Sequence, residues 1–342
     1  MGVIATGLLP NLPRPRGPLS AALTDLLRAG TPMTGAPLPR DDAATTGWDE
    51  DTQLALYLCY ELHYRGFAGV DDDWEWDPGL LRLRHRLEER FLDAVRADIG
   101  VVPPLAEQLE ALLVEPADGD GVSHFLLREG RPWQAREYLV HRSLYHLKEA
   151  DPQAWVIPRL HGGAQAAVVA IEFDEYGAGR PERVHSRLFA DMMADFGLDP
   201  GYGHYLDAVP APALAVVNLM SLFALHRRHR GALVGQFAGV EITSSPGSAR
   251  LAEAFERLGA GPAGTAFYRE HVEADAVHEQ LVRHGVIDAL VRDEPQTEQD
   301  IAFGLAASSL VEERLARHLV SSWRRQRSSL HSPLGDAVRP SS

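Results

Sequence analysis

The chain has 342 residues, a formal net charge of −15 at pH 7 and a single cysteine, Cys59. This length is typical of one large or two smaller globular domains with a substantial core. The acidic balance argues against non-specific nucleic-acid binding, which needs a basic surface. One cysteine excludes an internal disulfide and a cysteine-rich metal site, and it is typical of a reducing cytoplasm, where we expect the protein to act.

Residues 1–46 are rich in Pro, Gly and Ala, with one amphipathic stretch near 18–29, and we interpret them as a flexible arm. From Trp48 onward, apolar residues recur at helical spacing between clusters of Pro, Gly and Asp. The pattern predicts helices over 50–64, 78–98, 102–114, 134–150, 163–176, 181–196, 211–229, 231–258, 265–291 and 297–326. Because no segment alternates with the period of a strand, the chain is predicted to be all-α.

The helical part divides near residue 120, at the sequence EPADGDG. We expect a smaller N-terminal helical region over 47–120, a larger bundle over 121–326, and a disordered tail over 327–342, where the apolar period is lost. The longest apolar run, 211–225, is shorter than the roughly 20 residues that cross a bilayer, so it predicts a buried helix and no membrane partner.

Helical bundles build metal sites from acidic and histidine side chains that project inward from several helices. Glu241 is the only charged residue in the stretch GALVGQFAGVEITSSPG. Burying such a carboxylate is costly unless it is paired or binds a cation. Its small neighbours Gly235, Ala238 and Gly239 would permit close helix packing, so we predict a functional role for Glu241.

The segment REHVEADAVHEQL, residues 269–281, places His271, Asp275 and His278 within roughly 60° of one another on an α-helix. This arrangement favours a metal site. The alternative is a polar helical stripe, since glutamates occur at 270, 273 and 279.

Two further segments contain acids next to apolar runs. Glu175 follows the run AVVAIEF, and His185 comes ten residues later, beyond two glycines that prevent any fixed angular relation from being derived. Glu149 ends a predicted helix beside Lys148, where an exposed glutamate is the alternative. Together these segments offer four carboxylates and three imidazoles, more than one zinc ion needs and suited to two iron or manganese ions.

Four segments, taken in order, resemble the haem-oxygenase-like diiron oxidases, a family of iron-containing redox enzymes. They are LKEADPQAWVIPRL (147–160), EFDEYGAGRPERVH (172–185), GALVGQFAGVEITS (231–244) and HVEADAVH (271–278). The resemblance covers roughly residues 47–325 and implies a haem-oxygenase-like bundle over 121–326. It also makes the preceding helical region a candidate homodimer interface.

The resemblance implies a ligand set as well. The six usual metal ligands match Glu175, His185, Glu241, His271, Asp275 and His278. Glu149 matches an additional carboxylate found in N-oxygenating members. Glu172 and Asp174 are candidates for the outer shell of these ligands. The histidines near Glu149, His141 and His146, match no ligand of the family.

By this resemblance we expect two Fe ions, O2 as co-substrate and an external electron donor. The expected reaction is N-oxygenation of a small amine, guanidine or amino-heterocycle, such as 2-aminoimidazole or an arginine derivative, to an N-hydroxy or nitro product in specialised metabolism. We expect the reaction to stop at oxygenation, since the residues after the bundle are too few for the cupin domain of one related member. Two alternatives remain open: desaturation or C–C cleavage of an aliphatic or amino-acid substrate, and a non-catalytic binding protein with a degenerate site.

Overall fold

The computed structural model describes residues 9–30, 46–114 and 119–334. Within these ranges the chain is helical and contains no strand, which confirms the all-α prediction. The N-terminal helices are α1 (Pro18–Arg28), α2 (Glu50–Glu61), α3 (Pro78–Ile99) and α4 (Leu105–Leu112). No described helix is long and apolar enough to cross a membrane.

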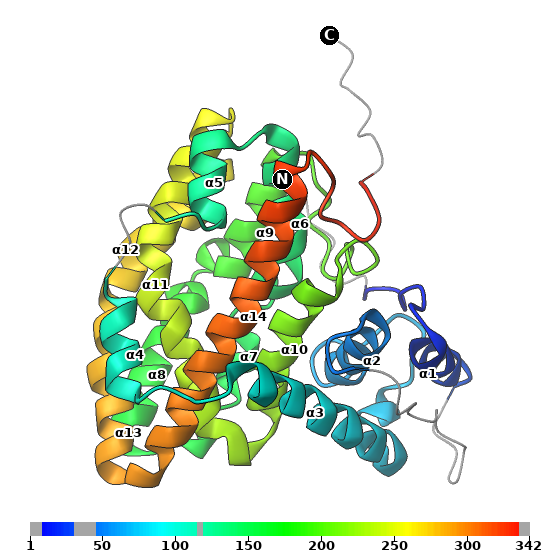
Figure 1. The fold of residues 1–342 in the computed structure, drawn as a ribbon, viewed down its shortest axis with the longest axis horizontal. Coiled ribbons are helices and arrows are strands. Elements are labelled where there is room, and N and C mark those ends of the chain that lie inside the picture. The colour runs from blue at the N-terminus through cyan, green and yellow to red at the C-terminus, as the bar shows by residue number, and fades with distance from the viewer. Residues whose placement is uncertain (1–8, 31–45, 115–118, 335–342) are drawn as a thin grey trace.

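The remaining helices form the bundle. They are α5 (Val122–Glu129), α6 (Pro132–His146), α7 (Asp151–Ala154), α8 (Gly162–Glu175), α9 (His185–Asp195), α10 (Ala211–Leu225), α11 (Arg230–Arg257), α12 (Ala263–Gln280), α13 (Asp288–Asp293) and α14 (Glu298–Arg324). A π-helical segment, Leu281–Ile287, joins α12 to α13. Helix α11 packs along both α12 and α14, and α12 packs against α9 (Figure 1).

The close packing of α11 on α14 depends on glycine. A Cβ atom added to Gly235 would lie 1.9 Å from the Ile301 carbonyl oxygen, and one added to Gly304 would lie 1.9 Å from the Ala232 carbonyl oxygen. Both distances are far shorter than a non-bonded contact between carbon and oxygen, so a side chain at either position would push the helices apart. The expectation that small residues around Glu241 permit close packing therefore holds for Gly235. Gly239 differs, because nothing lies within 4 Å of a Cβ built there.

Helices α1, α2 and α3 gather at one side of the bundle, coloured from dark blue (α1) to teal (α3) in Figure 1. Helix α2 packs against α10, and α3 packs against α14. Residues 18–28, expected in a flexible arm, form α1 instead. The Asp51 carboxylate accepts hydrogen bonds from the backbone amides of Leu19 (2.8 Å) and Ser20 (2.7 Å), which satisfies two donors at the start of α1. Residues 1–8 and 31–45 of the predicted arm lie outside the described residues.

The C-terminal segment also differs from the prediction of a disordered tail over 327–342. Ser329 is buried, and both its backbone amide (2.9 Å) and its hydroxyl (2.7 Å) donate to Glu137 Oε2 on α6. Trp323 Nε1 donates to the same oxygen at 2.9 Å. These polar contacts hold residues near 329 against the bundle although the apolar period has ended. Residues 335–342 lie outside the described residues.

One helix boundary and one whole helix differ from the sequence prediction. The helix predicted over 134–150 ends at His146, so Glu149 lies in the turn between α6 and α7 rather than at a helix end. Helix α5 was not predicted, because its eight residues are too few to show a helical period above the surrounding Gly and Asp.

Candidate metal centre

The structure brings together side chains from five separate elements. Glu149 lies in the turn after α6, Glu175 ends α8, His185 begins α9 and Glu241 lies within α11. Helix α12 carries the remaining three side chains, and all seven predicted ligands are buried: Glu149, Glu175, His185, Glu241, His271, Asp275 and His278.

Six of the seven form two overlapping clusters. In the first, one ligand atom from each of Glu149, Glu175, His185 and His271 lies within 4.8 Å of the others. In the second, Glu175, Glu241 and His278 meet the same limit. Glu175 belongs to both clusters, with Oε2 2.8 Å from His185 Nδ1 and Oε1 3.8 Å from His278 Nδ1.

The turn between α8 and α9 positions two of these side chains. After Glu175 the chain passes through two short 3-10 turns, Gly177–Gly179 and Pro181–Arg183, before His185 begins α9. Gly177 has φ +77°, and a Cβ there would lie 2.7 Å from the backbone nitrogen of Val184. Only glycine fits this reversal, which returns His185 to the end of the helix that carries Glu175.

Glu175 and His185 make a short contact that is not a hydrogen bond. Glu175 Oε2 and His185 Nδ1 are 2.8 Å apart, yet neither atom makes a hydrogen bond of acceptable geometry with a described residue. Two donor atoms about 2.1 Å from one ion and at right angles to each other lie about 3 Å apart. The spacing therefore fits a shared metal ion.

His271 is oriented by the backbone. Its Nδ1 donates to the Phe267 carbonyl oxygen at 2.8 Å, one helical turn earlier. The other ring nitrogen, Nε2, is left facing Glu149 Oε1 at 3.6 Å. An outer acceptor that fixes the tautomer in this way is the usual partner of a metal-binding histidine.

His278, a member of the second cluster, contacts Glu241 with one ring nitrogen and Asp174 of α8 with the other. Its Nδ1 is 3.1 Å from Glu241 Oε2, and its Nε2 is 3.4 Å from Asp174 Oδ2. Asp174, suggested by the sequence as an outer partner, is therefore within hydrogen-bonding distance of a predicted ligand. Glu172, the other suggestion, is buried and neither of its carboxylate oxygens has a hydrogen-bond partner among the described residues.

Asp275 stands beside the second cluster rather than within it. Its Oδ1 is 3.6 Å from His278 Nδ1, and its Oδ2 is buried without a hydrogen-bond partner in the described part of the chain. Its role as a ligand, like the roles of the other six residues, stays a prediction.

The electrostatics of the site follow from many buried charges in close contact. Burial and the nearby Asp275 charge raise the pKa of Glu241 to about 7, although hydrogen bonding to His278 opposes them. Burial lowers the pKa of His271, but the charge and hydrogen bonding of Glu149, together with the charges of Asp275 and Glu175, outweigh burial and raise the pKa to about 10. For His278, burial likewise lowers the pKa, but the carboxylates of Asp275, Glu241 and Glu175 together outweigh burial and raise the pKa to about 11. A metal cation would replace protons on these imidazoles.

Unpartnered carboxylate oxygens are a second observation that fits a metal centre. Glu149, Glu175 and Asp275 each leave one buried carboxylate oxygen without a hydrogen-bond partner among the described residues. Beside them is a cavity of about 10 Å³, which has room for about one water-sized group. A donor set of mixed oxygen and nitrogen atoms suits iron.

His146 is a residue of the site that sequence reasoning set aside. Its Nδ1 is 2.8 Å from Glu149 Oε1, and its ring stacks on Tyr145 with a centroid distance of 4.6 Å. The signal that could have identified it is the spacing of three residues between His146 and Glu149, which a helical turn brings together.

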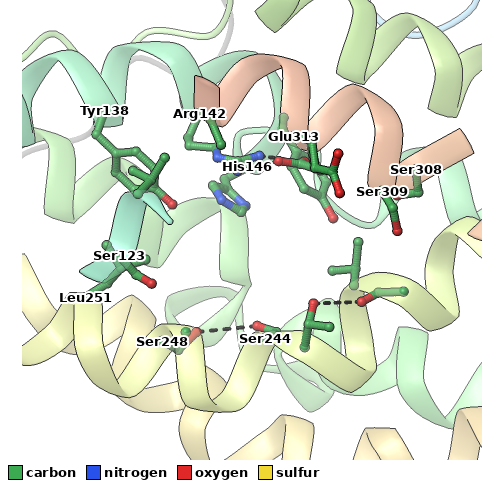
Figure 2. A pocket seen from close by; sticks show the side chains of 18 of the residues that line it. Ser123, Tyr138, Arg142, His146, Ser244, Ser248, Leu251, Ser308, Ser309 and Glu313 are labelled. Carbon is green, nitrogen blue, oxygen red and sulfur yellow. Dashed lines mark hydrogen bonds and ion pairs between the residues drawn. The ribbon is translucent and has the colours of Figure 1, made fainter. Parts of the chain in front are cut away.

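A larger cavity of about 390 Å³ lies next to the clusters, between α6, α11, α12 and α14. It shares Tyr145, Val240 and Ser244 with the small cavity at the metal ligands. Figure 2 shows Ser308, Ser309 and Glu313 of α14 across this space from Ser244 and Ser248 of α11. Gly239 also lines it, which explains why a Cβ at that position would meet open space.

The fold and these clusters define an iron-containing redox enzyme. The sequence profile of the family described by that name matches residues 136–313, more than half of the chain, and the chain belongs to this family. The family resemblance noted from the sequence is thereby confirmed.

Among characterised proteins, the chain is similar to a nitrosourea synthase from Streptomyces achromogenes subsp. streptozoticus. The two are 24% identical over 157 residues, which is 46% of this chain and 33% of the relative. The chain thus matches about a third of the length of this relative.

Proposed function

We propose that the protein is an O2-dependent diiron N-oxygenase that converts an amine, guanidine or amino-heterocycle nitrogen to an N-hydroxy or nitro product. The observation that carries this proposal is the place of Glu149 in the first cluster, with its Oε1 3.6 Å from His271 Nε2. A carboxylate at this position is the feature that the family's N-oxygenating members share. The similarity to a nitrosourea synthase supports the same reading.

In this proposal Glu149, Glu175, His185 and His271 hold one iron. Glu175, Glu241 and His278 hold the second, with Asp275 beside them. Two irons bound in this way would supply the site at which O2 is reduced. For each hydroxylation, one oxygen atom enters the N–H bond of the substrate and the other leaves as water, with two electrons and two protons from an external donor.

The protein's own side chains orient this centre. The Phe267 carbonyl and the Asp174 carboxylate fix the rings of His271 and His278. His146 holds Glu149 from the side of the larger cavity. Tyr145, Val240 and Ser244 line both that cavity and the small one at the metal ligands, so in this proposal a substrate nitrogen would reach the centre from their side.

Anaerobic loading with Fe(II), addition of a reductant and exposure to isotopically labelled O2 tests the proposal. Mass spectrometry of an amine panel is expected to show labelled oxygen in the product. Loss of two hydrogens or of a carbon fragment would instead support the alternative reactions. Glu149→Gln should abolish oxygen transfer, whereas Glu182→Gln, an exposed glutamate in the turn before α9, should retain it. Retained transfer in Glu149→Gln would refute the role given to Glu149.

A further inference from the structure

The charge balance of the larger cavity restricts what it can bind. Among the described residues, Arg142 is the only Lys or Arg that lines it, and the lining acids are Glu312 and Glu313. The cavity therefore has one more acidic than basic side chain.

Arg142 already forms an ion pair with Glu312. Its Nη1 donates to Glu312 Oε1 at 2.8 Å and its Nη2 to Glu312 Oε2 at 2.6 Å, a bidentate ion pair in which both side chains are mostly shielded from solvent. A substrate carboxylate would have to break this pair, leaving Glu312 in a poorly solvated position without its partner. The remaining donor, Arg142 Nε, is buried and has no hydrogen-bond partner among the described residues, so Arg142 could offer an anion one N–H at most without breaking the pair.

The other positive groups near the cavity are also engaged. His146 contacts Glu149 through Nδ1. Arg250 does not line the cavity but donates from Nε to the hydroxyl of Ser123, which does, and it has a further interaction as well. No described cation is thus available to receive an anionic group.

Glu313, unlike Arg142, has a charge that no ion pair with a described residue neutralises. It is exposed at the cavity, and no ion pair joins it to a described residue (Figure 2). Hydroxyl groups at 123, 243, 244, 248, 308 and 309 surround the same space and can accept hydrogen bonds from N–H donors. Most of the exposed lining is apolar, and these hydroxyls and Glu313 are its main polar groups, so a ligand with N–H donors would find its acceptors at a few defined places.

The size of the cavity adds a limit. A volume of about 390 Å³ is near the small end of the range for ligand pockets, which suits a metabolite. A ligand in this cavity would lie beside the metal ligands, because Tyr145, Val240 and Ser244 line both this cavity and the small one next to them.

We infer that the cavity selects a compact cationic amine, guanidine or amino-heterocycle that carries no carboxylate group. The inference rests on the proposed function for the identity of the cavity as the substrate site. It separates two of the substrates compatible with that function, since 2-aminoimidazole meets the requirement and an arginine derivative with a free carboxylate does not.

Matched ligand pairs that differ only in the carboxylate test the inference. Calorimetric binding to the full chain, before and after anaerobic Fe(II) loading, would compare agmatine with arginine, cadaverine with lysine, putrescine with ornithine and histamine with histidine. At least one amine is expected to bind ten times more tightly than its amino acid. Equal or tighter binding of the amino acid in every pair, or no binding by any amine, would overturn the inference.

Two matched variants locate the effect. Glu313→Gln should weaken binding of the preferred amine threefold to tenfold and leave its amino-acid partner unchanged. Glu298→Gln removes the same charge from the exposed start of the same helix, about 22 Å away at 1.5 Å per residue, and should change neither. Equal effects of the two variants would refute recognition by Glu313.

Binding is measured without O2, so the two proposals can fail separately. Selective amine binding without any oxygenated product would refute the N-oxygenase function and leave the charge selectivity standing. Oxygenation of an amino acid in preference to its amine would refute the selectivity and leave the function standing.

Discussion

Replacing Glu175 with Gln should disturb both halves of the metal centre at once. Glu175 is the side chain common to both clusters, with Oε2 2.8 Å from His185 Nδ1 and Oε1 3.8 Å from His278 Nδ1. The amide keeps the size of the side chain but removes the charge and one acceptor oxygen. A single substitution therefore weakens two sites.

The magnitude follows from the position of the carboxylate. Loss of an outer partner of a metal ligand typically weakens metal binding about 10- to 100-fold. A direct ligand should reach at least the upper end, so each dissociation constant is expected to rise at least about 100-fold, or about 3 kcal/mol per ion. His185→Gln should lose mainly the first ion and His278→Gln mainly the second.

Anaerobic Fe(II) titration followed by metal analysis after desalting measures the stoichiometry. The unmodified chain should retain two ions and Glu175→Gln fewer than one at the same Fe(II) concentration. Glu172→Gln is the matched control, three residues earlier on α8. Burial and the charges of Glu175 and Glu241 raise the pKa of Glu172 to about 9, so this side chain is already neutral at pH 7. If Glu175→Gln still bound two ions with unchanged affinity, Glu175 could not be a ligand shared by both clusters. Loss of both ions in Glu172→Gln would also refute this role, because the control should keep them.

Three further outcomes are expected. Because the pKa values of His271 and His278 are raised to about 10 and about 11, metal binding must displace protons from both, so apparent Fe(II) affinity should rise with pH between 6 and 8; a flat profile in calorimetry would contradict this. Burial lowers the pKa of His141 to about 3, whereas its value in the unfolded chain is about 6.5. Between pH 6.5 and pH 3 the folded state therefore binds fewer protons than the unfolded state. The free energy of unfolding should fall as the pH drops through this range, by on the order of 5 kcal/mol in total. Urea unfolding of His141→Gln should show a weaker loss between pH 7 and 4, and identical pH profiles would count against the assignment. Gly239→Leu should fill the larger cavity and reduce amine binding at least tenfold while the thermal midpoint stays within a few degrees, since a Cβ there meets no atom within 4 Å; unchanged amine binding would place the ligand elsewhere.

Long helices were the most predictable part of the fold. Those now seen as α3, α10, α11 and α14 repeat apolar residues over many turns, and each prediction is within a few residues of the observed bounds. Short α5 was missed, and the end of α6 was placed too late. Burial of Ser329 against Glu137 could not be predicted either, because it depends on tertiary hydrogen bonds rather than on periodicity.

The site was predictable where a residue contradicted its local surroundings. Glu241 is a single charge in an apolar helix, and the three α12 side chains share one helical face. The relation of Glu175 to His185 depends on a left-handed glycine turn whose path the sequence does not specify. The cavity was beyond prediction, because its lining comes from helices far apart in the sequence and partly from the missing side chain of Gly239.

The turn that carries Glu149 is also tied to the N-terminal helices. Lys148, the preceding residue, is buried and its Nζ donates to Glu61 Oε2 of α2 at 2.9 Å. Tyr202 donates to both oxygens of the same carboxylate, at 2.7 and 2.8 Å. A fragment beginning at residue 121 would lose the Glu61 carboxylate together with the Tyr57 and Tyr64 rings that lie against Lys148 Nζ, so the residue before Glu149 would lose its ion pair and its cover. The bundle is therefore not a transferable module, and any relative that exchanges its N-terminal helices must supply a new counter-charge for the residue next to Glu149.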